Sequence, residues 1–578
     1  MEWWLGLWKI VVAVFSLVLD VAQYWRDKLL SWWASKSPRA RLGHVLATAE
    51  TYEEWEEAAF ELDELLSKDL WRQNPVSRHY DYRLILGRLE ALMNAREEED
   101  IFTLANLLRS GLVRNLGNIT SAKLFTHAFA GTKLLIDDYI TQVALSIQYV
   151  AALQPMPAHA PAGFTSQAKL ELLHDTRQAF GRTTLLLQGG SAFALCHLGV
   201  VRALHLQGLL PRIVTGTATG AIIAALVGIH PEDELLALLD GDSLDLSAFH
   251  CRRKSKTDGT ATTEAWLRAI LRGMNHFVQK GHLFDDDALE DCVRAHVGDL
   301  TFEEAYARSK RILNITVATT GKNGLPNLLN YLTAPNVLIW SAAVASNASS
   351  SSLTDSPVTI YCKDETGSIV PWPHTHDAIF QPWRHVHYKD GESPLSRIAE
   401  LFNVNHFIVS QARPSLIPFD RDQTGITHLT RSCTQLILSE VRHRLRQLDY
   451  LTLLPASISR LLIDEAIPGP NLTLVPDLSW RDLISLFRDP TSQRIAEWIR
   501  KGERGVWPAV SALKVREAVE IELDRGYQLV RRRRPSDVSV PPAVASAPRP
   551  LPNEEIPRRR LGYGENGDEA DGGSVDAE

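Results

Sequence analysis

The sequence contains little cysteine and shows none of the cysteine patterns that define a structural framework. Its 578 residues include five cysteines, Cys196, Cys251, Cys292, Cys362 and Cys433, with no Cys-x-x-Cys pair among them. An odd, scattered set argues against both a disulfide framework and a zinc site, and it favours a reducing compartment. The chain also has no basic stripe interleaved with aromatic residues, so its composition gives no indication of a nucleic-acid partner.

The composition that remains is that of a large folded protein. The length predicts two to four domains, and an apolar fraction of 45% with a charged fraction of 22% allows a sizeable core. The net charge of −8 is mild for a chain of this size. No internal repeat with a fixed period is visible, which argues against a solenoid or a propeller.

The amino-terminal segment 1–35 is the candidate for a membrane contact. Trp3 to Trp25 is long enough as a helix to cross about 30 Å of hydrocarbon, although Lys9 and Asp20 interrupt it. We expect this segment to form a single span or a shallow hairpin in a membrane or at a lipid-droplet surface. The endoplasmic reticulum is the expected membrane. An in-plane amphipathic anchor and a buried helix of the main body are the alternatives. Basic residues follow directly, which predicts a cytosolic main body.

The rest of the chain divides into four parts by residue pattern. Residues 45–155 carry apolar residues at helical intervals and predict a helical region. Residues 180–400 alternate strand and helix patterns, which predicts βαβ units on a mostly parallel sheet. Residues 401–530 are expected to form a largely helical extension. Residues 535–578 are rich in Pro, Gly and acidic residues and are expected to be disordered.

Residues Gly216 to Gly220 have the Gly-x-Ser-x-Gly spacing of a serine-hydrolase nucleophile elbow, but Ala218 stands at the nucleophile position. Such a strand-to-helix turn lifts its central side chain clear of the backbone, and its glycines let neighbouring elements approach closely. The following stretch, AIIAALVG, is typical of the buried helix behind an elbow. The pattern is therefore complete except for the serine.

A second glycine-rich turn lies upstream, at Gly189, Gly190 and Ser191. It opens a predicted helix, whose first N–H groups and positive dipole end are suited to an oxyanion hole for an ester carbonyl. A phosphate cradle would use the same features. The sequence has, however, no P-loop Lys-Ser/Thr pair and no intact Gly-x-Gly-x-x-Gly, so we favour the oxyanion hole.

The stretch 189–228 resembles the patatin-like phospholipase domain, in particular that of the fungal and plant patatin-type triacylglycerol lipases. The segments WRQNPVSRHYDYRLILGRLEALMNARE and ELFNVNHFIVSQARPSLIPF extend the similarity to roughly residues 50–530. The resemblance implies an α/β fold, a patatin-like three-layer α/β/α domain with helical flanks. It also implies hydrolysis of carboxylic esters in acylglycerols or phospholipids, with no cofactor and no metal.

The resemblance further implies a Ser–Asp dyad that works without histidine. The Asp-Gly pair of that family corresponds to Asp390, which would act as the general base, although an exposed Asp-Gly turn is a common alternative. Because Ala218 has no nucleophilic oxygen, hydrolysis would need Thr217 or Thr219, water activated by Asp390, or a distant serine such as those at 349–352.

Two further residue patterns receive a structural interpretation. His197 follows the glycine-rich turn and is interpreted as a packing or hydrogen-bonding residue. The stretch from His282 to Asp287 contains His-x-x-x-x-Asp, an acyltransferase-like spacing, but its acidic residues are equally suited to the first turn of a helix.

Two functions therefore remain open at the level of sequence. The chain is either a lipid acyl hydrolase with residual or rerouted activity, or a catalytically inactive relative. The inactive relative would bind lipid at the former active site or regulate an active lipase partner. Retention of Asp390 and the glycine-rich turn favours the hydrolase, and Ala218 favours the inactive relative.

Overall fold

The structure is a computed structural model of the chain. It describes residues 38–153, 164–189, 191–239, 293–320, 327–347, 359–373, 379–380, 393–412, 467–476 and 492–532, together with Gln23, Arg26, Leu478, Asp482 and parts of 436–451. The chain divides into one unit from Met1 to Arg531 and another from Arg532 to Glu578. The tail expected to be disordered, 535–578, lies outside the described residues.

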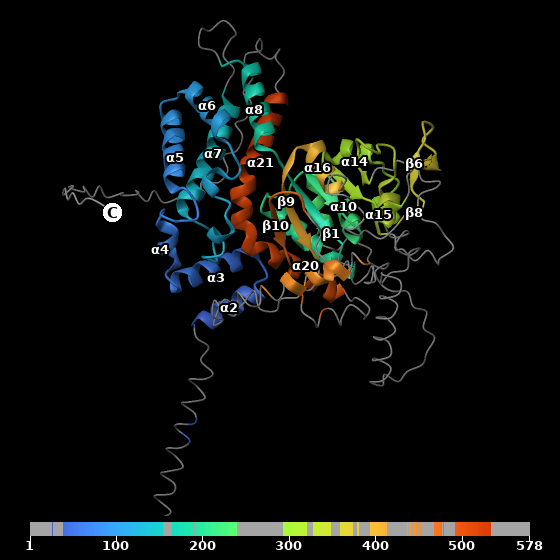
Figure 1. Ribbon diagram of the computed structural model, residues 1–578, viewed down its shortest axis with the longest axis horizontal. Helices are drawn as coiled ribbons and strands as arrows, with labels where there is room; N and C mark the ends of the chain where they lie inside the picture. The colour runs from blue at the N-terminus through green and yellow to red at the C-terminus, as the bar shows by residue number, and fades with distance from the viewer. Residues whose placement is uncertain are drawn as a thin grey trace, which may run out of the picture. The chain divides into compact units, whose positions relative to one another are not determined.

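A six-stranded sheet organises the first unit (Figure 1). Its strands follow the order β10, β9, β1, β2, β3, β5. They span Arg182–Gln188 (β1), Ile213–Gly216 (β2), Ile312–Thr316 (β3), Leu328–Leu329 (β5), Val404–Gln411 (β9) and Asn471–Leu474 (β10). All neighbours are parallel except β5, which runs antiparallel to β3. The prediction of an α/β fold with a mostly parallel sheet is confirmed.

Strand β1 lies inside the sheet and is buried on both faces. Leu185 and Leu187 belong to the core on one face, and Leu186 belongs to the core on the other. This division follows from the alternation of side chains along a strand. Because helices cover both faces, the strand reads as an apolar run rather than as an alternating pattern.

Helices form the outer two layers. They span Cys196–Leu206 (α9), Thr219–Ile229 (α10), Glu232–Leu239 (α11), Phe302–Ser309 (α14), Ile339–Asn347 (α15), Pro394–Phe402 (α16) and Ser492–Val506 (α20). Residues of α9, α10, α15 and α20 fill the core on one face of the sheet, and residues of α16 fill the core on the other. The described residues also form two small antiparallel pairs, β4 (Thr319–Thr320) with β8 (Ile379–Phe380) and β6 (Tyr361–Lys363) with β7 (Ile369–Pro371).

The amino-terminal part of the unit is helical, and we call helices α2 to α8 the amino-terminal module. They span Pro38–Thr48 (α2), Tyr52–Leu65 (α3), Lys68–Gln73 (α4), Tyr82–Glu97 (α5), Ile101–Gly111 (α6), Leu134–Ala152 (α7) and Ser166–Phe180 (α8). Several of these helices begin after a Thr or Asp residue of the type that commonly caps a helix amino terminus. Thr51, Asp81, Asp100 and Thr165 each accept a hydrogen bond from the backbone N–H three residues on.

The last helix among the described residues, α21 (Val510–Arg532), packs into this module although it lies more than 300 residues further along the chain. Its Val515, Val519 and Leu523 share one buried core with Ile136 and Ile147 of α7. Figure 1 shows α21, in red, between the amino-terminal helices and the sheet. The two ends of the folded chain therefore complete a single core.

The prediction of a single-pass membrane protein is wrong. Within the described part of the chain, no helix combines the length and the apolar character that a membrane crossing requires. Trp3 to Trp25, where we placed the segment, lies outside the described residues except for Gln23. The physical reason is present in the sequence, because Lys9 and Asp20 confine the uninterrupted apolar run to residues 10–19, about half of the ~20 residues that a span needs.

A buried histidine stands where the module, α21 and the sheet meet. His406 of β9 is 2% exposed, and neither of its ring nitrogens has a hydrogen-bond partner among the described residues. Burial, with a smaller contribution from the nearby cations Arg114 and Arg516, lowers its pKa to about 2. The imidazole is therefore neutral in the folded chain at every physiological pH.

We predict that His406 makes the folded chain less stable in acid. The unfolded chain binds a proton at His406 below about pH 6.5 and the folded chain does not, so the free energy of unfolding falls by about 2 kcal/mol between pH 8 and pH 5. His406→Leu should remove this part of the slope and raise the urea midpoint most at pH 5. The measurement is urea unfolding at several pH values, with His44→Ala, at an exposed position, as control. Equal slopes for wild type and His406→Leu would contradict the assignment.

Candidate functional site

The carboxyl ends of β1 and β2 bring the two glycine-rich turns together. Leu187 pairs with Gly216 in the parallel register, so each strand reaches its turn at the same edge of the sheet. The Thr217 N–H donates to the Leu187 carbonyl oxygen over 3.1 Å, which continues the pairing for one more residue. Residues more than 25 positions apart in sequence are thereby placed side by side.

The backbone at Ala218 adopts a conformation that L-residues avoid. Its φ is 50° and its ψ is −127°, a region populated almost only by glycine, and holding alanine there costs about 1–3 kcal/mol. Helix α10 begins at the next residue, Thr219. The Ala218 N–H donates to the Ser346 hydroxyl oxygen at 2.9 Å. This is the sharp strand-to-helix bend of a nucleophile elbow, and its central side chain is a methyl group.

The elbow depends on contacts that only glycine permits. A Cβ at Gly220 would lie 2.1 Å from the Leu187 carbonyl oxygen, and a Cβ at Gly216 would lie 2.4 Å from the Ala221 Cα. Helix α10 is therefore pressed directly against the backbone of β1. The glycine spacing noted in the sequence has a steric cause here, independent of any nucleophile.

The upstream turn faces the elbow. A Cβ at Gly189 would lie 2.8 Å from the Ala218 Cβ and 3.3 Å from the Thr217 carbonyl oxygen. Ser191 opens a short 3₁₀ segment, Ser191–Leu195, that leads into α9, and Gly190 lies outside the described residues. Of the three predicted oxyanion residues, Gly189 is the one that the structure places next to Ala218, the predicted nucleophile position.

His197 fixes the orientation of this turn. Its Nε2 lies 2.6 Å from the Gln188 carbonyl oxygen, and its Nδ1 lies 2.7 Å from the Ser410 hydroxyl oxygen. A carbonyl only accepts, so Nε2 carries the proton, and Ser410 donates to Nδ1. Burial lowers the pKa of His197 to about 4, which keeps the ring neutral. Because the 188–189 peptide is trans, its N–H points away from His197.

Other predicted residues are either engaged elsewhere or outside the described part of the chain. The Thr217 hydroxyl is buried and donates to the Leu187 carbonyl oxygen at 3.5 Å, so it is not directed at a substrate. Asp390, the serines at 349–352 and the stretch 282–287 lie outside the described residues. Among the described residues, no group of three His, Cys, Asp or Glu side chains could hold a metal ion.

Sequence reasoning did not identify Ser346 and Ser410 as parts of the site. Ser346 belongs to the last turn of helix α15 and lies 128 residues from Ala218, and Ser410 lies 213 residues from His197. Both are buried serines in apolar stretches. A buried hydroxyl group requires a hydrogen-bond partner. This requirement is the one signal in the sequence that could have indicated the two serines, but it does not identify their partners.

A parallel sheet whose strands end in a glycine turn beside a strained elbow is typical of ester hydrolases. A family model described as patatin-like phospholipase matches residues 185–368, and one described as a domain of unknown function (DUF3336) matches residues 32–178. The chain belongs to the family of patatin-like triacylglycerol lipases, on the strength of relatives at about 30% identity over most of its length.

Among those relatives are two lipases of Schizosaccharomyces pombe. Triacylglycerol lipase ptl1 is 32% identical, and the alignment covers 90% of this chain and 89% of that protein. Triacylglycerol lipase ptl3 is also 32% identical, with 84% and 96% covered. The crystal structure of the type III effector ExoU aligns with 60% of this chain and 54% of its own at 13% identity, with a TM-score of 0.22, which is too low to bear on the fold.

We predict that Ala218→Gly stabilises the chain. Glycine adopts this φ without strain, and the relief exceeds the entropy that glycine adds to the unfolded state, for a net gain of about 1 kcal/mol. Ala224→Gly, at a buried position of α10, should instead cost about 1 kcal/mol, because glycine weakens a helix interior. Urea midpoints of the two variants measure the difference. A lower midpoint for Ala218→Gly would show that the backbone at this residue is not strained.

Proposed function

We propose that the chain is a patatin-type lipid acyl hydrolase that acts on the carboxylic esters of acylglycerols or phospholipids. The observation that supports this most directly is the backbone at Ala218, which keeps the strained elbow geometry with no serine to present. The family supports lipid ester substrates, and several relatives are named as triacylglycerol lipases. Lipid esters presented at a membrane or lipid-droplet surface are the proposed partners.

In the proposed reaction, the ester carbonyl lies between residue 218 and the glycine turn, with its oxygen directed at the N–H groups that begin at Gly189. Asp390 takes a proton from a water molecule, whose oxygen adds to the carbonyl carbon. The N–H groups stabilise the resulting oxyanion, and Gly190 and Ser191 are assigned to the same role. Collapse breaks the ester C–O bond, and Asp390 returns its proton to the leaving alcohol oxygen, which leaves a fatty acid and an alcohol.

A second candidate function follows from Ala218 itself. In subtilisin, which is a different serine hydrolase, loss of the nucleophile alone lowers turnover about 10⁶-fold, so a methyl group at this position removes the main route. The chain would then bind lipid esters at the elbow without hydrolysing them, or would regulate an active lipase. In that case Gly189 would face the ligand, and Gly216 and Gly220 would keep the elbow in shape beside it.

The test compares fatty-acid release from triacylglycerol and phospholipid emulsions by wild type, Asp390→Asn, Ala218→Ser and the double variant. Because the elbow is already bent, Ala218→Ser should raise release at least 10²-fold over wild type, and Asp390→Asn should return it to background. Thr217→Ser is the matched control, since it keeps a hydroxyl beside the elbow and places none at its centre.

Each outcome selects one of the two functions. Release by wild type that disappears in Asp390→Asn supports hydrolysis by activated water. Release by Ala218→Ser alone supports the non-catalytic lipid-binding protein on an intact scaffold. Absence of release from every variant, with folding confirmed, would overturn the proposed site.

A further inference from the structure

The amino-terminal module meets the sheet at the start of β1, at the opposite end of the strand from the glycine turn. The module matches a domain described only as of unknown function. Its Arg114 lies between α6 and α7 and reaches both β1 and α21. The guanidinium stacks over the Phe180 ring, 4.7 Å from its centroid, and its side chain is 9% exposed. A single arginine thus links three parts of the chain.

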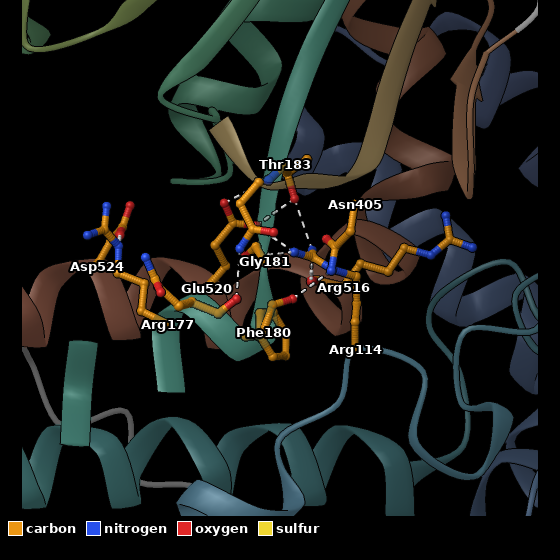
Figure 2. Close-up of polar contacts among 11 residues, drawn as sticks. Arg114, Arg177, Phe180, Gly181, Thr183, Asn405, Arg516, Glu520 and Asp524 are labelled. Carbon is orange, nitrogen blue, oxygen red and sulfur yellow. Dashed lines mark hydrogen bonds and ion pairs between the residues drawn. The ribbon is translucent and has the colours of Figure 1, made fainter. Parts of the chain in front are cut away.

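Arg114 and Glu520 together hold Thr183, as Figure 2 shows. Glu520 accepts from the Thr183 N–H at 2.9 Å and from the Thr183 hydroxyl at 2.6 Å. Arg114 donates to the same hydroxyl oxygen at 2.9 Å and to the Glu520 carboxylate at 3.0 Å. Hydrogen bonds or an ion pair therefore join each pair of residues within the trio. We call Arg114, Thr183 and Glu520 the β1 clamp.

The β1 clamp lies at an irregularity in the sheet. The register of β1 with β9 shifts between Arg182, which pairs with Val404, and Thr183, which pairs with His406. The skipped residue, Asn405, donates instead to the Phe180 carbonyl oxygen at 2.8 Å. Its side chain passes so close to the strand that a Cβ at Gly181 would lie 2.3 Å from its amide nitrogen. Gly181 accordingly has a φ of +79°.

A bulge of this kind disrupts the ladder locally and leaves backbone groups without a partner on the neighbouring strand. The Glu520 carboxylate takes up the N–H of Thr183, and Arg114 also binds the Gly181 carbonyl oxygen at 3.2 Å. A slip of one residue would break these bonds and leave a buried charge without its partner. It would also turn every β1 side chain to the other face of the sheet.

We propose that the amino-terminal module, through the β1 clamp, locks the register of β1 and so positions the glycine turn at its far end. Gln188, whose carbonyl oxygen binds His197, and Gly189, which faces Ala218, both follow from that register. The module is thus a positioning element of the site rather than a separate binding domain. Arg114 of the module and Glu520 of α21 are the positioning residues. The role does not depend on whether the site hydrolyses esters.

The test is hydrogen–deuterium exchange on the full chain carrying Arg114→Met. We expect exchange of the amides from 183 to 195 to accelerate at least tenfold, while helix α5 and strand β3 keep their wild-type rates. Arg109→Met is the matched control, because Arg109 belongs to the same module but forms an exposed ion pair with Asp175, with side-chain exposures of 55% and 57%. The Arg109→Met variant should show wild-type exchange rates for the amides from 183 to 195.

Glu520→Gln provides a second variant that keeps the side-chain shape, and it should accelerate the same amides. Unchanged exchange from 183 to 195 in both variants would overturn the lock. A uniform loss of protection in all strands, or failure of both variants to fold, would also overturn it, because either shows only a general contribution to stability. Exchange needs no ester release, so failure of the proposed function would leave this test unaffected.

Discussion

The direct contact between helix α10 and the backbone of strand β1 is the constraint on which the site depends. Gly220 leaves no room for a side chain above the Leu187 carbonyl oxygen, and Gly216 leaves none beneath Ala221. With the helix held this close, the three residues between the glycines have to turn sharply. The bend, its strain and the nearness of the upstream glycine turn all follow from that packing.

This explains how the elbow persists with alanine at its centre. In a serine hydrolase the strained backbone presents the serine oxygen, and in this chain packing and the hydrogen bond from Ala218 to Ser346 maintain the same bend. His197 does the same for the neighbouring turn through Gln188 and Ser410. The scaffold of the site is therefore physically separable from the nucleophile, which is the property that both proposed functions use.

The sequence predicts those features that short-range patterns specify. The apolar run of β1, the glycine spacing around Ala218 and the helical periodicity of residues 45–155 each carry a local steric or hydrophobic cause. Contacts between distant segments leave no such pattern. Nothing near Arg114 indicates Glu520, and the packing of α21 against α7 joins the two ends of the folded chain. The prediction of a membrane span is wrong because the tryptophans at both ends of the segment resemble an interfacial belt, while Lys9 and Asp20 leave too short an apolar run between them.

The packing of α21 into the amino-terminal module has a consequence for synthesis of the chain. The module leaves the ribosome first, yet the helix that supplies Val515, Val519 and Leu523 to its core follows some 330 residues later. At ordinary rates of translation the module waits roughly 15–70 s with an apolar face uncovered. We therefore expect the nascent chain to expose this apolar face until α21 is made, and a product that ends before α21 to keep it exposed.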